Sequence, residues 1–237
     1  MEKPFKINFS SGISAQAIHI NDENQISDAL NKLGLRLGHP TIVLVGGAGG
    51  LSDEDLKNLS PIFWEVLAPI AETLKVNILD GGTNAGVMRL MGQARMKISA
   101  NFPLIGIAAK GTVILPDVES LDQEAAPLES HHTHFVLVPG DNWGDESPWL
   151  SQIATKLAKS APSITVLING GEIARKDVEH SLFDKRPVVV VAGSGRLADE
   201  LAADGKDIPL IKIINLTDGL ENIIELFRNL LKENYDE

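Results

Sequence analysis

The chain has 237 residues, 43% of them hydrophobic and 22% charged, which fits one large α/β domain or two small ones and excludes a disordered protein. It contains no cysteine, so disulfides and thiolate metal sites are excluded, which agrees with a reducing compartment without proving one. Its 21 basic and 32 acidic residues give a net charge of −11, which opposes general nucleic-acid binding.

The N-terminus lacks the apolar stretch of a signal peptide, and no segment reaches the ~20 apolar residues of a membrane helix. We therefore expect a cytoplasmic protein without a membrane span. An anionic ligand of such an acidic protein would have to be held by local dipoles.

The first 40 residues predict strands at 6–9 and 17–20 and a helix at 24–37, as an N-terminal extension packed on the main domain. From residue 41, short β-branched runs alternate with helical patterns, which is typical of a parallel sheet covered on both faces. We expect strands at 41–45, 76–79, 104–107, 134–138, 164–168, 188–191 and 210–214. The expected helices are 53–75, broken near Pro61 or Pro69, and 85–98, 147–159, 174–183, 198–203 and 220–232.

This order predicts an α/β fold, a Rossmann-like α/β/α arrangement of three layers with a mainly parallel central sheet of about seven strands. No linker divides the chain, so residues 1–237 are expected to form one domain. Its parts are the extension 1–40, a nucleotide-binding core 41–205, and a C-terminal strand and helix within 206–237.

The structure of two segments of this domain is open to more than one interpretation. Residues 111–133 are polar, with four acidic residues between Asp117 and Glu124, and indicate a surface loop or flap. The helix 220–232 carries apolar residues at helical spacing, so we expect it to pack on the domain, with a dimer surface as the alternative.

Glycines follow five of the expected strands. The exits read GGAGG (46–50), DGGTNAG (80–86), PGDNWG (139–144), NGG (169–171) and AGSGR (192–196). One glycine pair after a strand is usually an ordinary tight turn or helix cap. Ligands of open α/β sheets bind at the carboxyl ends of the strands, where glycine allows close approach and helix N-termini attract anions. Five such exits predict a nucleotide or phosphate site, although no GxxxxGK[ST] P-loop occurs.

These exits resemble the SLOG superfamily, and within it the N-terminal cytosolic (LSDAT) domain of the TRPM ion channels and its free-standing prokaryotic relatives. The matching stretches are GGAGG, ILDGGTNAGVMRLMGQA, LIGIAAKGTV, HHTHFVLVPGDNWG, ITVLINGGEIA and VVVVAGSGRLADELA. The resemblance implies a non-catalytic sensor that binds ADP-ribose or a related NAD-derived nucleotide and requires no cofactor. Its output would pass through an effector protein or through self-association.

The resemblance also implies which residues bind the ligand. Trp143 would stack on the base or ribose, or else anchor a partner protein. Arg196 would donate to a phosphate, or else form a salt bridge to Asp199 or Glu200. A second arginine of the channel relatives falls on Leu150, which removes one contact and leaves the ligand's identity open. The full predicted set is Gly46, Gly47, Ala48, Gly49, Gly81, Gly82, Thr83, Asn84, Gly86, Val87, His134, Gly140, Trp143, Gly144, Gly193, Ser194, Gly195 and Arg196.

Three histidines close together raise the question of a metal site. On an extended strand His132 and His134 share a face while His131 points away, and no acidic residue stands at a recognisable ligand spacing. No metal is therefore predicted. His134 is expected to hold loop geometry or to touch the edge of the ligand.

Glu146 supports an alternative, catalytic function. The Lonely Guy phosphoribohydrolases, another SLOG branch, use a glutamate in a PGGxGTxxE loop to cleave an N-glycosidic bond. Here Pro139 and Gly140 match, but Asp141 replaces a glycine, GT is missing, and Glu146 stands one residue early. The alternative functions are thus a hydrolase that uses Glu146 and an interaction module, while a helix N-cap is the plainer role for Asp145 or Glu146.

Overall fold

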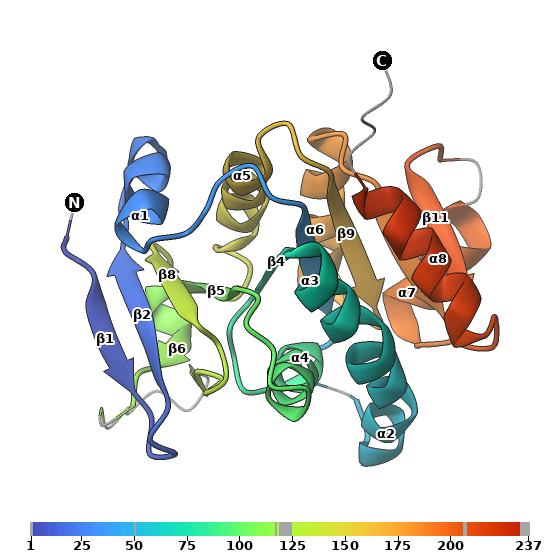
Figure 1. Cartoon of the computed structure of the whole chain (residues 1–237), viewed down its shortest axis with the longest axis horizontal. Helices are drawn as coiled ribbons and strands as arrows, with labels where there is room; N and C mark the ends of the chain where they lie inside the picture. Colours follow the sequence, from blue (N-terminus) through green and yellow to red (C-terminus); the bar gives the residue numbers. More distant parts are fainter. Residues whose placement is uncertain (1, 50, 117, 119–124, 206–207, 233–237) are drawn as a thin grey trace.

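The computed structural model describes residues 2–49, 51–116, 118, 125–205 and 208–232, and its centre is a nine-stranded sheet (Figure 1). The strands are β1 (Phe5–Asn8), β2 (Ser14–His19), β3 (Thr41–Gly46), β4 (Asn77–Asp80), β5 (Leu104–Ala109), β8 (His134–Val138), β9 (Ser163–Ile168), β10 (Val188–Ala192) and β11 (Ile211–Asn215). Their order across the sheet is β1-β2-β8-β5-β4-β3-β9-β10-β11.

The seven strands expected after residue 40 all form and pair in parallel with their neighbours. The two extra strands come from the expected N-terminal extension. β1 and β2 form an antiparallel hairpin, and β2 continues the sheet by pairing in parallel with β8, with Gln16 opposite His134. The hairpin is thus part of the sheet and does not pack on it from outside.

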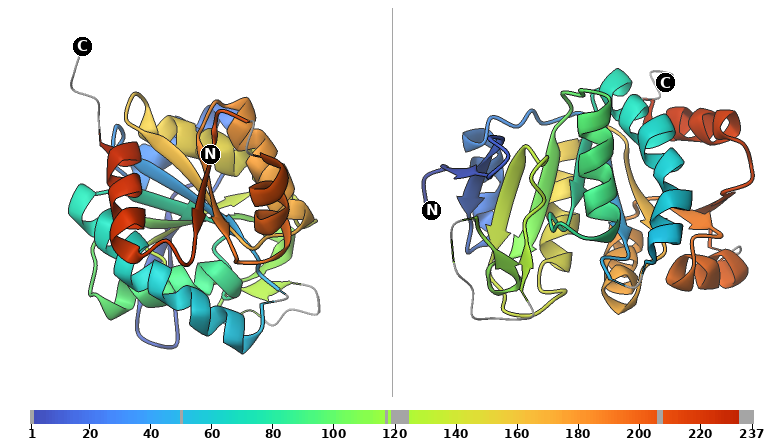
Figure 2. Two further views of the ribbon diagram at one scale, coloured as in Figure 1. Left: turned by 90° about the vertical axis from the view of Figure 1, so that its right-hand side faces the viewer. Right: turned by 90° about the horizontal axis from the view of Figure 1, so that it is seen from below.

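Helices cover both faces of the sheet, which confirms the three-layer arrangement. One face carries α1 (Ile26–Lys32), α5 (Ser147–Ala158), α6 (Glu172–Phe183) and α7 (Arg196–Asp204). The other carries α2 (Asp53–Pro61), the π-helical segment η2 (Ile62–Leu67), α3 (Ala68–Leu74), α4 (Gly86–Lys97) and α8 (Leu220–Leu231). The side view in Figure 2 (left) shows α8 and α7 on opposite sides of the strands.

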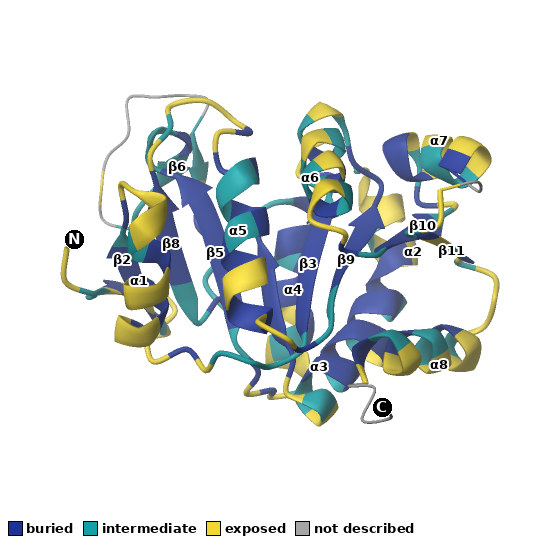
Figure 3. Cartoon of the chain, turned by 90° about the horizontal axis from the view of Figure 1, so that it is seen from above, coloured by how far each residue is buried: buried dark blue, intermediate teal, exposed yellow. Residues whose placement is uncertain are grey.

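The core lies on both faces of the strands. Along β3, Ile42 and Leu44 join the cluster beneath α4 and α8, while Val43 and Val45 join the one beneath α5 and α6. Figure 3 shows the central strands buried and the outer faces of the helices exposed. Because side chains alternate along a strand, burial on both faces explains the continuous apolar runs in the sequence.

Helix boundaries follow the sequence signals closely. The expected helix 53–75 changes character near both prolines, since α2 ends at Pro61 and Pro69 lies in the first turn of α3. The first helix is shorter than expected and ends at Lys32, just before Gly34, whose φ of +73° does not continue a helix. The last helix, α8, packs on the domain through Ile223, Phe227 and Leu231.

The segment 111–133 differs from the expected surface loop. Its four acidic residues at 117–124 lie outside the described residues. Of the rest, Thr112, Leu128, Glu129 and His132 are buried, and β6 (Val113–Ile114) pairs with β7 (Ala126–Pro127). The polar sequence misled the prediction because Glu129 and His132 bury their polar groups against each other. Within the described residues, no helix is long and apolar enough to cross a membrane.

Candidate functional site

The order of the strands locates the site. From β3 the chain adds β4, β5 and β8 on one side, then returns to place β9, β10 and β11 on the other. This reversal between β3 and β9 is a topological switch point, where helices leave toward opposite faces and a crevice opens beyond the carboxyl ends of the strands. A cavity of about 400 Å³ lies there, next to the end of β3 at Gly46. Its volume falls in the usual range for small-molecule sites.

All five glycine exits contribute to this cavity. The sequence-predicted residues that line it are Gly46, Gly47, Ala48, Gly49, Gly81, Thr83, Trp143 and Arg196. The exit of β9 adds Gly171. Leu150, at the position of the family's second arginine, is buried and forms part of the apolar wall. The exits therefore gather at one edge of the sheet, as the sequence predicts.

Several other predicted residues belong to the packing beneath the cavity and do not line it. A Cβ atom on Gly82, whose φ is +71°, would lie 2.8 Å from Gly106 Cα and 3.0 Å from the Phe135 ring. A Cβ on Gly86, whose φ is +45°, would lie 1.7 Å from the Gly47 carbonyl oxygen. These two glycines let neighbouring segments of this chain approach each other, which is a structural requirement.

The exits of β9 and β10 are bonded to each other. The Asn169 N–H donates to Ser194 Oγ at 2.7 Å, and Asn169 Nδ2 donates to the Ser194 carbonyl at 2.8 Å. The Gly193 N–H donates to Asp199 Oδ1. The predicted residues that lie outside the lining of the cavity are Gly82, Asn84, Gly86, Val87, His134, Gly140, Gly144, Gly193, Ser194 and Gly195.

His134 lies at the opposite edge of the sheet, which corrects its predicted place at the ligand edge. It begins β8, at the amino end of the strand, and lines a separate surface pocket with Asn77 and Phe102. Its Nδ1 atom is 2.7 Å from Thr133 Oγ1. Burial lowers the pKa of His134 to about 4, so the imidazole is neutral at physiological pH.

Several hydrogen-bond donors belong to the side of the cavity that the glycine exits form. Within the described residues, the backbone N–H groups of Ala48, Gly49 and Gly171 donate to no other group. The Thr83 hydroxyl is buried and has no hydrogen-bond partner there. Buried polar groups are normally paired, so an unpaired hydroxyl in a cavity wall is a candidate ligand contact.

Arg196 supplies the positive charge of this side. It is the first residue of α7, and its Nη1 lies 3.4 Å from the Gly49 carbonyl oxygen. The expected alternative, a salt bridge to Asp199 or Glu200, does not form among the described residues. Asp199 accepts the Gly193 N–H, and Glu200 pairs with Arg175.

Carboxyl groups occupy another part of the wall. Glu146 is only 8% exposed, and its Oε2 accepts the Gly144 N–H at 3.0 Å. Asp177, from α6, has a buried Oδ1 without a hydrogen-bond partner among the described residues. Burial raises the pKa of Asp177 to about 7, and the nearby Glu146 raises it further. Burial also raises the pKa of Glu146, with Asp145 adding to the effect.

Asp177 was missed by the sequence analysis, although one signal was available. It stands in the stripe Ala174, Asp177, Val178, Ser181, whose other members are buried against the sheet at helical spacing. An acidic residue on such a face is unusual unless it is paired or functional. Glu172, Ile173, Met88 and Thr112 also line the cavity without a motif that marks them.

The expected helix N-cap at Asp145 or Glu146 is not formed by either side chain. Glu146 occupies the N-cap position of α5, but its side chain makes no capping bond there and turns back to Gly144. Asp145 Oδ2 accepts the N–H groups of Asp141 and Asn142 at 3.0 Å and fixes the preceding turn.

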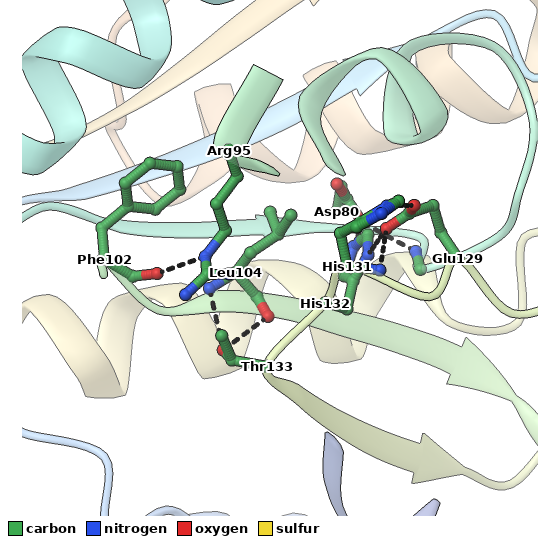
Figure 4. A network of polar contacts seen from close by, with 9 residues as sticks. Asp80, Arg95, Phe102, Leu104, Glu129, His131, His132 and Thr133 are labelled. Atoms are coloured by element: carbon green, nitrogen blue, oxygen red, sulfur yellow. Dashed lines mark hydrogen bonds and ion pairs between the residues drawn. The ribbon is translucent and has the colours of Figure 1, made fainter. Parts of the chain in front are cut away.

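A buried ionic network of Asp80, Glu129, His131 and His132 holds the β4 exit in place (Figure 4). Asp80 Oδ1 accepts the Gly82 N–H at 2.7 Å and lies 2.8 Å from His132 Nε2. The other ring nitrogen of His132 lies 2.9 Å from Glu129 Oε2, and Glu129 Oε1 lies 2.6 Å from His131 Nδ1. The acidic partners that the sequence did not reveal therefore exist. Among the described residues, however, no group of three histidine or acidic side chains is arranged to hold a metal ion.

Burial alone would lower the pKa of His132, but Asp80 and Glu129 outweigh it and raise that pKa to about 9. The pKa of Glu129 is lowered by His132 and His131 in spite of its burial. His132 is therefore a buried imidazolium at neutral pH, held between two carboxylates. It ties the β4 exit to the segment 125–133.

Comparison with known sequences gives one family. The sequence profile described as "SLOG in TRPM, prokaryote" matches residues 39–229. The chain is 27% identical to transient receptor potential cation channel subfamily M member 2 of Rattus norvegicus over 196 residues, which cover 68% of this chain and 13% of the channel. It is 29% identical to member 6 of Homo sapiens over 177 residues, which cover 62% of this chain and 9% of that channel.

Two solved structures share the fold. The X-ray structure of the structural-genomics target TM1055 has a TM-score of 0.53 and 19% identity, covering 80% of this chain and 99% of that one. The molybdenum cofactor binding protein of Rippkaea orientalis has the same TM-score and identity, covering 82% of this chain and 98% of that one.

Proposed function

Because the chain belongs to the family described as "SLOG in TRPM, prokaryote", we propose that it is a non-catalytic nucleotide sensor whose ligand is ADP-ribose or a related NAD-derived nucleotide. The chain spans 13% of the rat channel it resembles, so the proposal concerns a ligand-binding domain and not channel activity.

The observation that carries the proposal is the group of unused donors at the switch-point cavity. The N–H groups of Ala48, Gly49 and Gly171, the Thr83 hydroxyl and the Arg196 guanidinium all belong to its lining. Together they can hold a diphosphate in a protein of negative net charge, because main-chain dipoles and one guanidinium act at short range. Structural turns alone would leave no reason for a buried, unpaired hydroxyl.

Trp143 is suited to cover the base or the ribose. Its side chain lines the cavity and is 37% exposed. A large aromatic face in the wall of the cavity can stack on a planar base at small entropic cost.

Calorimetric titration with ADP-ribose, NAD and AMP tests the proposal. We expect saturable binding of at least one diphosphate ligand, with AMP weaker because it lacks the second phosphate. A protein that keeps its circular dichroism spectrum but binds none of the three would overturn the proposal and favour an interaction module.

Glu146 supports a second candidate function, a nucleotide or nucleoside hydrolase of the phosphoribohydrolase type. It lines the cavity, is buried, and has a raised pKa, as a general acid or base at neutral pH requires. Chromatography of the same ligands after incubation separates the two functions. A sensor leaves the nucleotide intact, whereas a hydrolase releases base or ribose phosphate, and Glu146→Gln would abolish the release.

A further inference from the structure

The cavity is lined by two kinds of polar group. The β3, β4, β9 and β10 exits supply donors and the Arg196 guanidinium, whereas the body of α6 and the residue before α5 supply the carboxyl groups of Asp177 and Glu146. Both acids line the cavity; Glu146 is buried, and Asp177 is half-buried with its Oδ1 atom out of contact with water.

The carboxyl wall has acceptor capacity that the chain does not use. Glu146 Oε2 accepts one bond, from the Gly144 N–H. Asp177 Oδ1 has no hydrogen-bond partner of full geometry within the described residues, and the buried Ser147 hydroxyl beside it is close enough to lower the pKa of Asp177 as a donor. An unpaired buried carboxyl oxygen is costly, and a ligand group that donates to it would remove the cost.

The chemistry of this wall limits what can face it. A phosphate brings only acceptors and negative charge, so it would be repelled at the short range of a partly desolvated cavity. A sugar hydroxyl is neutral and donates a hydrogen bond, and a carboxylate on the ribose hydroxyls is the arrangement that dinucleotide-binding folds commonly use. The raised pKa of Asp177 fits either case, because a carboxyl group can accept from or donate to a hydroxyl.

We propose that Asp177 and Glu146 bind the 2′- and 3′-hydroxyls of the adenosine ribose of the ligand, and that the cavity therefore selects nucleotides in which this diol is free over those that carry a 2′-phosphate. This inference rests on the proposed function, because it requires the ligand's diphosphate to lie on the side of Arg196 and the glycine exits. It assigns to Asp177, which no family motif marks, the discrimination between the two ligand classes.

The test is a pair of calorimetric titrations, with ADP-ribose and with ADP-ribose 2′-phosphate. In the unmodified protein we expect the 2′-phosphate to bind at least about tenfold more weakly. In Asp177→Asn, which keeps the volume but removes the charge, we expect ADP-ribose to weaken and the ratio of the two dissociation constants to fall at least about fivefold.

Glu179→Gln is the matched control. Glu179 is an exposed acid on the same helix and lies outside the cavity lining, so its replacement should leave the ratio unchanged. Chromatography after each titration verifies that the ligand is intact, and circular dichroism verifies that each variant is folded.

The outcomes separate the two proposals. If the unmodified protein binds both nucleotides equally, or if Asp177→Asn keeps the original ratio, the diol subsite is wrong while the nucleotide sensor stands. If the folded protein binds neither, the proposed function fails and the diol subsite with it.

Discussion

At the scale of single residues, the position of the Arg196 guanidinium depends on a glycine at position 171. A Cβ atom on Gly171 would lie 2.4 Å from Arg196 Nη2, so the guanidinium lies directly over the start of α6. Glycine at position 171 thus leaves space for the arginine as well as an unused N–H for a ligand. Two separate strand exits build one corner of the cavity, where we propose that a phosphate binds.

Replacing Arg196 by alanine should weaken binding of ADP-ribose by about 1.5–3 kcal/mol, the range for a hydrogen bond to a charged group. Calorimetry measures the change. Arg175→Ala is the control, since Arg175 forms an exposed ion pair with Glu200 and lies outside the lining. An unaltered dissociation constant in Arg196→Ala would remove this residue from the site.

Gly86→Ala should lower the free energy of unfolding by more than about 1 kcal/mol, because both its φ of +45° and the close Gly47 carbonyl oppose a side chain. Gly12→Ala serves as the control, since Gly12 has a φ of +81° but open space around it. Urea unfolding compares the two. Equal losses would mean that the contact with Gly47 has no energetic consequence.

Asp177→Asn should be more stable than the unmodified protein at high pH, and this difference should grow as the pH rises. The pKa of Asp177 is raised from 3.8 to about 7 by burial and then by Glu146, while Ser147 and Lys176 lower it. The folded state keeps the proton that the unfolded chain releases near pH 4, so the unmodified protein loses stability between about pH 4 and pH 7.

The uncharged variant avoids this loss and should be more stable at pH 8, by on the order of 1 kcal/mol or more. The advantage should vanish toward pH 4. Urea titrations at pH 4.5, 6 and 8 provide the measurement, with Glu179→Gln as control. A gain that does not vary with pH would contradict a buried proton on Asp177.

The sequence predicted where the glycines cluster but not which of them line the cavity. Gly47 and Gly82 occupy similar patterns, yet only Gly47 lines it. The difference comes from Gly106 and Phe135, which pack against Gly82 from another part of the chain. Local sequence does not contain that contact. Asp177 was in principle detectable as an acid on a buried helical stripe. Its place beside Glu146 in the cavity wall was not, because Glu146 comes from another element.

At the scale of elements, the His132 network fixes one exit loop to another segment. Asp80 at the end of β4 bonds both Gly82 and His132, and Glu129 completes the network from the segment 125–133. Because Gly81 and Thr83 line the cavity on either side of Gly82, this network positions cavity-lining residues without lining the cavity itself.

The network predicts a loss of stability at alkaline pH. The pKa of His132 is raised from 6.5 to about 9, so its stabilising effect is fully present below about pH 6.5 and is lost as the pH rises through about 9. The free energy of unfolding should therefore fall between pH 7 and pH 9.5. In His132→Gln it should be lower at pH 7 and should vary less over this range.

Urea unfolding at several pH values tests this expectation. His180→Gln, on α6 and outside the network, should keep the pH dependence of the unmodified protein. A His132→Gln variant with an unchanged slope would show that another group titrates.

At the scale of the whole molecule, one sheet joins the three buried apolar clusters. The cluster beneath α8 includes Phe227, which is 1% exposed, together with residues of α4 and β3. A terminal helix packed this way belongs to the cooperative unit of the domain.

Phe227→Ala should accordingly lower the free energy of unfolding by about 3–5 kcal/mol in a single transition. Phe183→Ala removes a phenyl group that is 86% exposed and should change stability by less than about 0.5 kcal/mol. Circular dichroism and tryptophan fluorescence should report the same midpoint for each variant. An early, separate loss of helix in Phe227→Ala would mean that α8 folds independently.

The layered α/β/α arrangement followed from the sequence because alternating strands and helices admit few arrangements. The position of the two N-terminal strands in the sheet did not follow from the sequence. β2 is recognisable as a strand from its own residues, but nothing near it specifies that its neighbour is β8. Pairing between distant segments is decided by the completed fold, which local periodicity does not contain.

The pairing of β2 with β8 also affects how the chain is made. Ile18 lies opposite Val136, so a ribosome that adds 5–20 residues per second leaves the hairpin without its neighbour for roughly ten seconds. During that interval the edge of β2 lacks the strand that pairs with it in the folded sheet, and the apolar side chains of Ile7 and Ala17 lack their neighbours Phe135 and Leu137 in β8.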